Sequence, residues 1–223
     1  MKLLATMLAL ALACASAARA QAPDMSCRNG SFPKTEKSIA LAKVAGADRL
    51  YFLNDADGCP NGTPACRQRA YVVAGNELLT GRGAGPYVCA FFPNRVGGSA
   101  GWIERARLVP VPVPASPPLG AWAGHWANGD DTIDLTVKAG ALVADGSAWW
   151  PSANPSPAQF PGGPNVGDLG GTARPSGAKV VFTDNDPSGC TATLTLVGTL
   201  LVVADNRNCG GMNVSFSGVY QRK

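Results

Sequence analysis

A proline-rich stretch near the middle of the chain places the strongest constraint on its fold. Residues Val109–Pro118 read V-P-V-P-V-P-A-S-P-P, with five prolines in ten positions. Proline fixes φ and has no amide donor, so neither a helix nor a central strand can run through this stretch. The expected conformation is extended polyproline II, which acts as a semi-rigid spacer. The sequence therefore predicts a linker over residues 109–118, between one module at residues 21–108 and a second at residues 119–223.

Residues 1–20 have the pattern of a secretory signal peptide. Lys2 supplies a positive charge, Leu3–Ala13 is apolar, and Ala18–Ala20 is a small-x-small cleavage site. The apolar run is too short for a permanent anchor, so we expect no transmembrane segment in the mature chain. Cleavage after Ala20 predicts a periplasmic or secreted protein. Attachment of a lipid at Cys14 is the less favoured alternative.

The net charge of the mature chain argues against a nucleic-acid partner. The signal segment holds two of the 19 basic residues and none of the 15 acidic ones, so the remainder carries a charge of +2. Phosphate binding needs a clustered basic face. The densest basic spots are Arg67–Arg69, the pair Arg105 and Arg107, and Arg222-Lys223, and we interpret each as a solvated surface feature.

Six of the seven cysteines follow the signal segment, and an even number in an exported chain predicts a disulfide framework. The spacing suggests how they pair. Cys59 and Cys66 would close a short loop, Cys190 and Cys209 would join neighbouring strands, and Cys27 would then pair with Cys89. Every predicted bond stays on one side of the linker. No CxxC is present, so neither a redox nor a zinc role is expected.

The first module is predicted to consist of five short strands joined by glycine turns and one long loop. Thr35–Val44 before them is predicted as a short helix or an irregular approach. The glycine turn is placed at Gly81–Gly85, and the long loop, Asn54–Gln68, contains Cys59 and Cys66. The predicted strands are Arg49–Leu53, Ala70–Val73, Glu77–Thr80, Tyr87–Phe92 and Gly101–Leu108.

Residues 44–110 resemble bacterial SH3-like modules. The residues that carry the resemblance are Ala70-Tyr71-Val72-Val73 with Gly75 and Leu78, and the closing Gly101-Trp102-Ile103 followed by Leu108. The resemblance implies a small barrel. It also implies the ligand class that such modules in exported proteins often bind, which is cell-wall peptide or glycan.

The second module is predicted to be an up-and-down antiparallel barrel of about eight strands, because closing a sheet removes its exposed edges. Its last segment, Met212–Tyr220, alternates strictly between apolar and small or polar residues, as a strand with one buried face does. A Pro/Gly/Ser-rich loop is expected at Pro151–Gly167. The other predicted strands are Leu119–Ala127, Thr132–Val137 with Ile133, Leu135 and Val137 inward, Ala141–Trp149, Asp168–Ala173, Ala178–Thr183, Thr191–Val197 and Leu200–Ala204.

Most of residues 119–222 resemble the C-terminal module of uncharacterised exported proteins of proteobacteria. The residues concerned are Trp122, Gly124 and Trp126 at the start and Asp205-Asn206 with Cys209–Tyr220 at the end. The resemblance implies no activity. The predicted fold class is thus all-β: an SH3-like small barrel and an antiparallel β-barrel of about eight strands, joined by the proline-rich linker.

No catalytic, cofactor or metal site is predicted. Gly97–Gly101 matches G-x-S-x-G, but a strand candidate follows it where a nucleophile elbow needs a helix, so we expect a hairpin turn. His125 is the chain's single histidine and should point away from the face that carries Trp122 and Trp126. Asn54–Gly58 and Thr183–Asp186 lack the oxygen ligands of a complete calcium loop and are expected to be turns.

Aromatic residues are the predicted binding groups. Trp149 and Trp150 are adjacent on a strand, so one indole should enter the core and the other should face outward beside the long loop, where it can stack on a sugar or peptide. The competing interpretation, which we favour, is that the loop folds back over it. Tyr51 and Trp102 are the other candidates for exposed rings.

The function predicted from these features is non-enzymatic binding in the cell envelope, to peptidoglycan or to a wall-associated partner protein. The alternative is inhibition of lysozyme or another cell-wall hydrolase.

Overall fold

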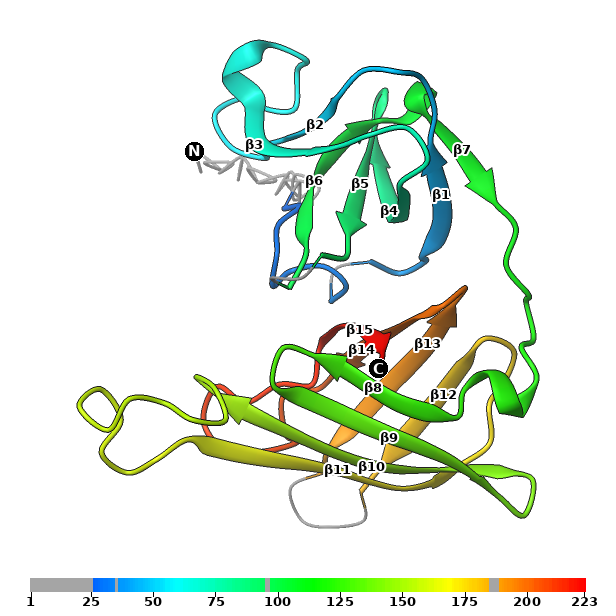
Figure 1. Ribbon diagram of the computed structural model, residues 1–223, viewed down its shortest axis with the longest axis vertical. Coiled ribbons are helices and arrows are strands. Elements are labelled where there is room, and N and C mark those ends of the chain that lie inside the picture. Colours follow the sequence, from blue (N-terminus) through cyan, green and yellow to red (C-terminus); the bar gives the residue numbers. More distant parts are fainter. Residues whose placement is uncertain (1–25, 35, 95–96, 185–188) are drawn as a thin grey trace, which may run out of the picture.

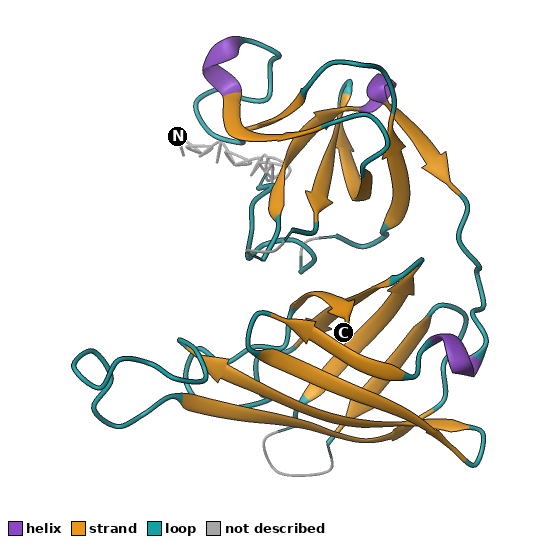
Figure 2. Cartoon of the chain, viewed as in Figure 1, coloured by secondary structure: helices purple, strands orange, loops and turns teal. Residues whose placement is uncertain are grey.

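The computed structural model describes residues 26–34, 36–94, 97–184 and 189–223, and these are almost entirely strands and loops (Figures 1 and 2). This confirms the all-β prediction. Three single-turn 3₁₀ helices occur in the described ranges: η1 (Pro64–Cys66), η2 (Arg105–Arg107) and η3 (Leu119–Ala121). No helix in these ranges has the length and apolar character needed to cross a bilayer. The predicted signal peptide and Cys14 lie outside the described residues.

The first module is a seven-stranded antiparallel sheet with the order β3-β2-β6-β5-β4-β1-β7. The prediction of five strands was therefore too low, because it omitted the strands at the start and at the end of the module. The strands are β1 (Ala40–Val44), β2 (Leu50–Leu53), β3 (Arg67–Val72), β4 (Glu77–Ala84), β5 (Tyr87–Phe92), β6 (Ser99–Glu104) and β7 (Leu108–Val111).

Two local predictions in this module were wrong. The helix considered for Thr35–Val44 is instead strand β1, which lies between β4 and β7; Thr35 itself is outside the described residues. The glycine turn expected at Gly81–Gly85 is largely strand β4. A Cβ atom at Gly81 would collide with the Glu36 carboxylate, so glycine there permits a close approach and not a turn.

The proline-rich stretch begins as an edge strand. In β7, Val109 pairs with Lys43 and Pro110 with Ala42, and β7 ends the sheet. A proline is tolerated at an edge because the missing donor faces no further strand. The chain then passes down one side of the molecule to η3, without regular structure over residues 112–118 (Figure 1).

The second module is an eight-stranded, nearly closed antiparallel barrel, as predicted. Its strand order is β11-β10-β9-β8-β15-β14-β13-β12, and the end strands β11 and β12 lie next to each other. The strands are β8 (Gly124–Asn128), β9 (Asp131–Lys138), β10 (Ala141–Trp150), β11 (Asn165–Ala173), β12 (Lys179–Thr183), β13 (Thr191–Val197), β14 (Leu200–Asp205) and β15 (Gly218–Arg222).

Large side chains fill the barrel interior. Trp122, Trp126 and Tyr220 are fully buried; the Trp126 indole donates to the Trp122 carbonyl at 2.9 Å, and the Tyr220 hydroxyl donates to the Phe216 carbonyl at 2.9 Å. Of the three residues expected inward on β9, Ile133 and Leu135 are buried. Val137 lies near the hairpin end of the strand and is exposed, so that part of the prediction was wrong.

The strand predicted over Met212–Tyr220 is shorter than expected. Hydrogen-bonded pairing begins only at Gly218, and Met212 is 77% exposed. Val214 and Phe216 are nevertheless buried as the alternation predicts. The pairing is replaced by the Asp205 carboxylate, which accepts hydrogen bonds from the Phe216 amide and from the hydroxyls of Ser215 and Ser217 at 2.6–2.8 Å.

Three disulfide bonds join the cysteines in the predicted pairs. They are Cys27–Cys89, Cys59–Cys66 and Cys190–Cys209, and each lies within one module.

The two modules share one hydrophobic cluster. On the barrel, four side chains of β13, β14 and β15 are buried in this cluster and not in the barrel core, namely those of Val197, Leu200, Val202 and Val219. A Cβ atom on Gly198 would lie 3.2 Å from the Leu41 side chain of β1, which shows how closely the modules approach. The residues of this interface include Phe32, Leu41 and Phe91 from the first module and Val197, Leu200, Val202 and Val219 from the barrel.

Candidate functional site

Arginine and tyrosine side chains alternate on the outer face of β3 and of β2 with the residue before it, Arg49. Tyr51 and Tyr71 are directly opposite each other in the two strands, with ring centroids 5.7 Å apart. The Arg49 guanidinium lies 4.5 Å from the Tyr71 ring, and that of Arg67 lies 5.4 Å from the Tyr51 ring. Each pair is within the range of a cation–π interaction. We call these four residues, together with Arg69, the arginine–tyrosine face.

The sequence produces this face by simple alternation. Along β3, Arg67, Arg69 and Tyr71 are two residues apart and share the exposed side, whereas Val72 is buried. Because β3 is the edge strand of its sheet, no neighbouring strand flanks it on one side. A row of rings and charges at a free edge is therefore open to a ligand.

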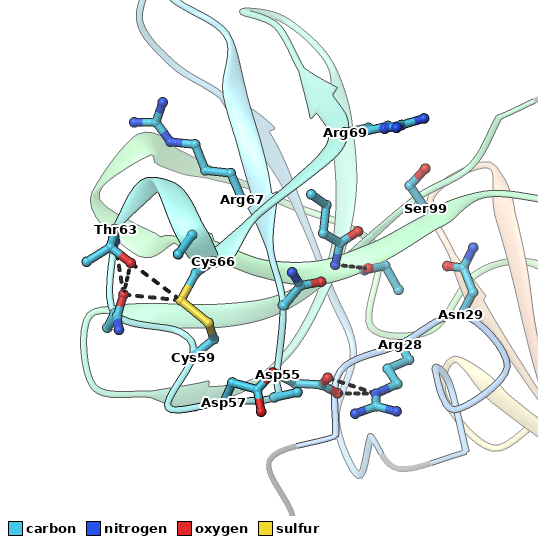
Figure 3. A pocket seen from close by; sticks show the side chains of 16 residues that line it. Arg28, Asn29, Asp55, Asp57, Cys59, Thr63, Cys66, Arg67, Arg69 and Ser99 are labelled. Carbon is cyan, nitrogen blue, oxygen red and sulfur yellow. Dashed lines mark hydrogen bonds and ion pairs between the residues drawn. A yellow bond between two sulfur atoms is a disulfide. The ribbon is translucent and has the colours of Figure 1, made fainter.

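A polar hollow of about 900 Å³ lies beside the arginine–tyrosine face (Figure 3). Its walls are the N-terminal segment, the loop closed by the Cys59–Cys66 disulfide, β3, and the start of β6. Arg67 and Arg69 belong both to the face and to the wall of the hollow. The two features therefore form one continuous surface.

Part of the polar lining holds the wall together. The largely buried Asp55 carboxylate accepts from the Arg28 guanidinium at 2.7–2.8 Å and from the Cys27 amide at 2.8 Å. Burial raises the pKa of Asp55, but these hydrogen bonds and the Arg28 charge outweigh it and hold the pKa below its usual value. The Gln68 amide donates to two backbone carbonyls, those of Leu53 and Ala100.

Other charged groups in the hollow remain available to a ligand. Within the described ranges, the Arg69 guanidinium and the Asp57 carboxylate make no hydrogen bond or ion pair. In Figure 3, Arg67 and Arg69 lie on one side of the hollow and Asp57 lies on the other. The hollow can thus attract a carboxylate at one end and an ammonium group at the other.

Trp149 and Trp150 stand at the mouth of the barrel, at the end of β10. Trp149 is half-buried, and its amide donates to the Asp131 carboxylate at 3.0 Å. Trp150 is 36% exposed, and the Phe160 ring packs against it in a T-shaped arrangement with ring centroids 5.4 Å apart. The long loop therefore folds back on Trp150 through Phe160, as the favoured interpretation predicted, but covers it only in part.

A second hollow, of about 450 Å³, opens beside Trp150. Lys34 of the first module and Arg207 of the barrel line it, together with Asn213, Val214 and Ser215. We call it the mouth hollow.

The other two aromatic candidates, Tyr51 and Trp102, differ in their burial. Tyr51 is half-buried in the arginine–tyrosine face, but Trp102 is fully buried, so the expectation of an exposed ring there was wrong. The residue is central because β6 lies between β2 and β5. Arg49, Arg67, Arg69 and Tyr71 were not selected from the sequence, although the period-two spacing of residues 67, 69 and 71 could have indicated them.

The G-x-S-x-G match and His125, which were considered as catalytic candidates, have structural surroundings. Gly97–Gly101 belongs to the connection from β5 to β6 and the start of β6, as expected for a hairpin. His125 is exposed and contacts Asp134 across β8 and β9 at 2.9 Å, away from the interior tryptophans as predicted. Within the described residues, no group of three or more His, Cys, Asp or Glu side chains is arranged to hold a metal ion.

Comparison of the chain with protein-family models, with curated proteins and with solved structures gave no match.

Proposed function

We propose that this protein binds peptidoglycan in the cell envelope, without catalysis, through the arginine–tyrosine face and the adjoining hollow. The observation that carries the proposal is the placement of Arg67 and Arg69 across the hollow from Asp57, next to a pair of tyrosine rings. The peptide stems of peptidoglycan contain both amino and carboxyl groups, which match these opposite charges. Their sugars offer C–H faces to the tyrosines.

The three disulfides support an oxidising compartment, the periplasm or the cell exterior. We propose that residues 1–20 direct export and that cleavage follows Ala20. The SH3-like resemblance of residues 44–110 points to the same ligand class. The candidate face and hollow lie largely within this segment.

Co-sedimentation with insoluble peptidoglycan tests the proposal. The mature chain, residues 21–223, should be retained, and retention should fall as salt is added because exposed charges are screened. Arg69→Gln and Asp57→Asn should each weaken retention about tenfold, the usual effect of removing one charged hydrogen bond. Arg174→Gln, an exposed arginine on the barrel, is the matched control and should bind like the unaltered chain.

Retention that is equal for Arg69→Gln, Asp57→Asn and Arg174→Gln would reject this surface as the binding site. A complete lack of retention by the unaltered chain would reject peptidoglycan as the ligand.

A second candidate function, inhibition of a wall hydrolase, is supported by the loop between β10 and β11. Residues 151–164 project from the barrel (Figure 1), and they are rich in exposed polar and proline residues. The Ala153 amide donates to the Asp130 carboxylate at 2.9 Å, and Phe160 packs on Trp150, so the loop is anchored at two points. An anchored, projecting loop can enter the cleft of an enzyme. Inhibition of lysozyme by the mature chain, lost on deletion of residues 155–159, would favour this function over wall binding.

A further inference from the structure

The mouth hollow joins parts of the protein that are distant in sequence. Lys34 comes from the segment before β1, Trp150 from the end of β10, Arg207 from the turn after β14, and Asn213 from the segment before β15. Lys34 belongs to the first module and the other three to the barrel. The hollow is therefore complete only when the two modules are docked.

Its lining carries two positive charges, those of Lys34 and Arg207, and the negative charge of Asp205 offsets them only in part. Within the part of the chain that the structure describes, neither Lys34 nor Arg207 makes an ion pair or a side-chain hydrogen bond. Asp205 is near, but its carboxylate already accepts three hydrogen bonds, from Ser215, Phe216 and Ser217. Burial and the nearby Arg207 charge both lower the pKa of Lys34, and Asp205 opposes them only in part. Two cations are thus held together, and neither forms an ion pair with Asp205 in the described residues.

The turn that carries Arg207 is fixed in place. Arg207 has φ +64°, a left-handed conformation that non-glycine residues rarely adopt. The neighbouring Asn206 side chain accepts from the Thr191 and Asn208 amides and donates to the Gly189 carbonyl. The Cys190–Cys209 disulfide ties down the end of the same turn. Arg207 is thus presented by a rigid support.

Trp150 adds an oriented aromatic surface. The Phe160 and Trp150 rings form a T-shaped pair, at 86° between planes, and Trp150 remains 36% exposed. A half-exposed indole held in one orientation is suited to stacking against the C–H face of a sugar ring. The Asn213 side chain, which makes no hydrogen bond within the described residues, offers a donor and an acceptor to ring hydroxyls.

We propose that the mouth hollow binds a sugar ring that carries a carboxylate, with Lys34 and Arg207 on the carboxylate and Trp150 against the ring. This site shares no residue with the arginine–tyrosine face and does not rest on the function proposed for that face. Two sources supply such a ring: the lactyl-bearing sugar of peptidoglycan strands from which the stem peptide has been removed, which frees the lactyl carboxylate, and a uronic acid of an acidic polysaccharide.

Titration of the ¹⁵N-labelled mature chain tests the proposal, followed through the indole N–H resonances of its tryptophans. The probes are N-acetylmuramic acid and glucuronic acid, with N-acetylglucosamine and glucose as their neutral counterparts. We expect the Trp150 resonance to shift with at least one acidic sugar, with a dissociation constant in the range of about 1 mM. The neutral counterpart should bind at least about tenfold more weakly.

The variants Lys34→Gln and Arg207→Asn should each weaken binding of the acidic sugar about tenfold. Asparagine adopts the left-handed conformation more readily than arginine, so Arg207→Asn removes the charge and preserves the turn. Lys138→Gln, an exposed lysine at the end of β9, is the control. Arg69→Gln should also bind the sugar normally, which separates this site from the one proposed above.

A stronger response to N-acetylmuramic acid identifies the wall sugar, and a stronger response to glucuronic acid identifies an acidic polysaccharide; either result supports the site. The proposal is overturned if neither acid shifts Trp150, if the neutral sugars bind as well as the acids, or if Lys34→Gln and Arg207→Asn bind like Lys138→Gln.

Discussion

The Asp131 carboxyl group lies beside the barrel mouth, where its Oδ1 accepts the hydrogen bond from the Trp149 amide. Burial raises the pKa of Asp131 to about 6, helped by the nearby charges of Asp130 and Asp205, while the Trp149 hydrogen bond acts in the opposite direction. A carboxyl group with a raised folded-state pKa favours folding most when it is protonated. Its contribution is full below about pH 4 and is lost as the pH rises through about 6.

Replacing Asp131 with asparagine should therefore flatten the dependence of stability on pH. The asparagine carbonyl can still accept from the Trp149 amide, but nothing ionises. The free energy of unfolding at pH 7.5 should rise by on the order of 1 kcal/mol. The full pKa shift of Asp131 would give a larger gain, but the carboxyl group is partly exposed and solvent screening reduces it. Near pH 4 the variant and the unaltered chain should be equally stable.

Urea denaturation at a series of pH values measures this effect. Asp168→Asn, at an exposed position on β11, is the control and should leave the profile unchanged. If Asp131→Asn keeps the same loss of stability between pH 5 and pH 7, another group causes it.

At the scale of elements, the segment from Asp205 to Gly218 shows how a side chain can replace strand pairing. Its alternation is that of a strand, and the inward residues Val214 and Phe216 are buried accordingly. The backbone there is not paired, because the Asp205 carboxylate binds one amide and two hydroxyls, and its own amide donates to Ser217 Oγ at 3.0 Å. One aspartate organises the approach to β15 and supports the turn that carries Arg207.

Asp205→Ala should destabilise the barrel by about 2–4 kcal/mol, because several hydrogen bonds are lost at once and the Phe216 amide is left without its acceptor. Hydrogen exchange should accelerate most at residues 213–217. The Asp168→Ala variant should change the free energy of unfolding by less than about 0.5 kcal/mol. If Asp205→Ala lowers the free energy of unfolding by less than about 1 kcal/mol, water replaces the carboxylate as hydrogen-bond acceptor for Ser215, Phe216 and Ser217 equally well.

The strands of this protein differ in how well their bounds can be predicted from the sequence. Period-two patterning and turn residues located the strands well: the predicted bounds of β5 and β13 are those observed. The predictions failed where a distant contact decides the local structure. Gly81 lies in a strand because β1 and β5 flank β4, and it is a glycine because Glu36 occupies the space that a side chain would need. Ala40–Val44 is a strand because β4 and β7 flank it.

The candidate site was harder to predict than the fold. Trp150, beside Trp149, and Tyr51 were selected for their aromatic rings, but the basic residues near them come together with them only through strand pairing and docking. Arg67 and Arg69 were interpreted as ordinary solvated charges. Nothing in the local sequence places Lys34 next to Arg207, because the two are brought together across the interface between the modules.

At the scale of the whole molecule, the two modules dock through apolar residues on the outer face of the barrel. Strand β14 contains the run Leu200–Val203, in which all four residues are buried. Leu201 and Val203 point into the barrel, while Leu200 and Val202 belong to the cluster shared with the first module. A strand buried on both faces gives a continuous apolar sequence of this kind.

Val202→Glu should separate the modules without unfolding the barrel, because it places a charge in the interface and leaves the inward residues untouched. Small-angle scattering should give a larger radius of gyration, and proteolysis within residues 112–118 should be faster. Val181→Glu makes the same change at an outward barrel position that is 49% exposed, and should remain compact. Equal compactness of the two variants would show that the shared cluster does not hold the modules together.

The two free edges of the seven-stranded sheet also bear on how the protein behaves at high concentration. An open edge invites another copy to add a strand, which is a route to aggregation. Along β7, Pro110 withholds a backbone donor; along β3, Arg67 and Arg69 would place like charges against those of an arriving copy. The residues that give β3 its proposed binding surface thus also oppose self-association, and a substitution that neutralises them should lower colloidal stability along with ligand binding.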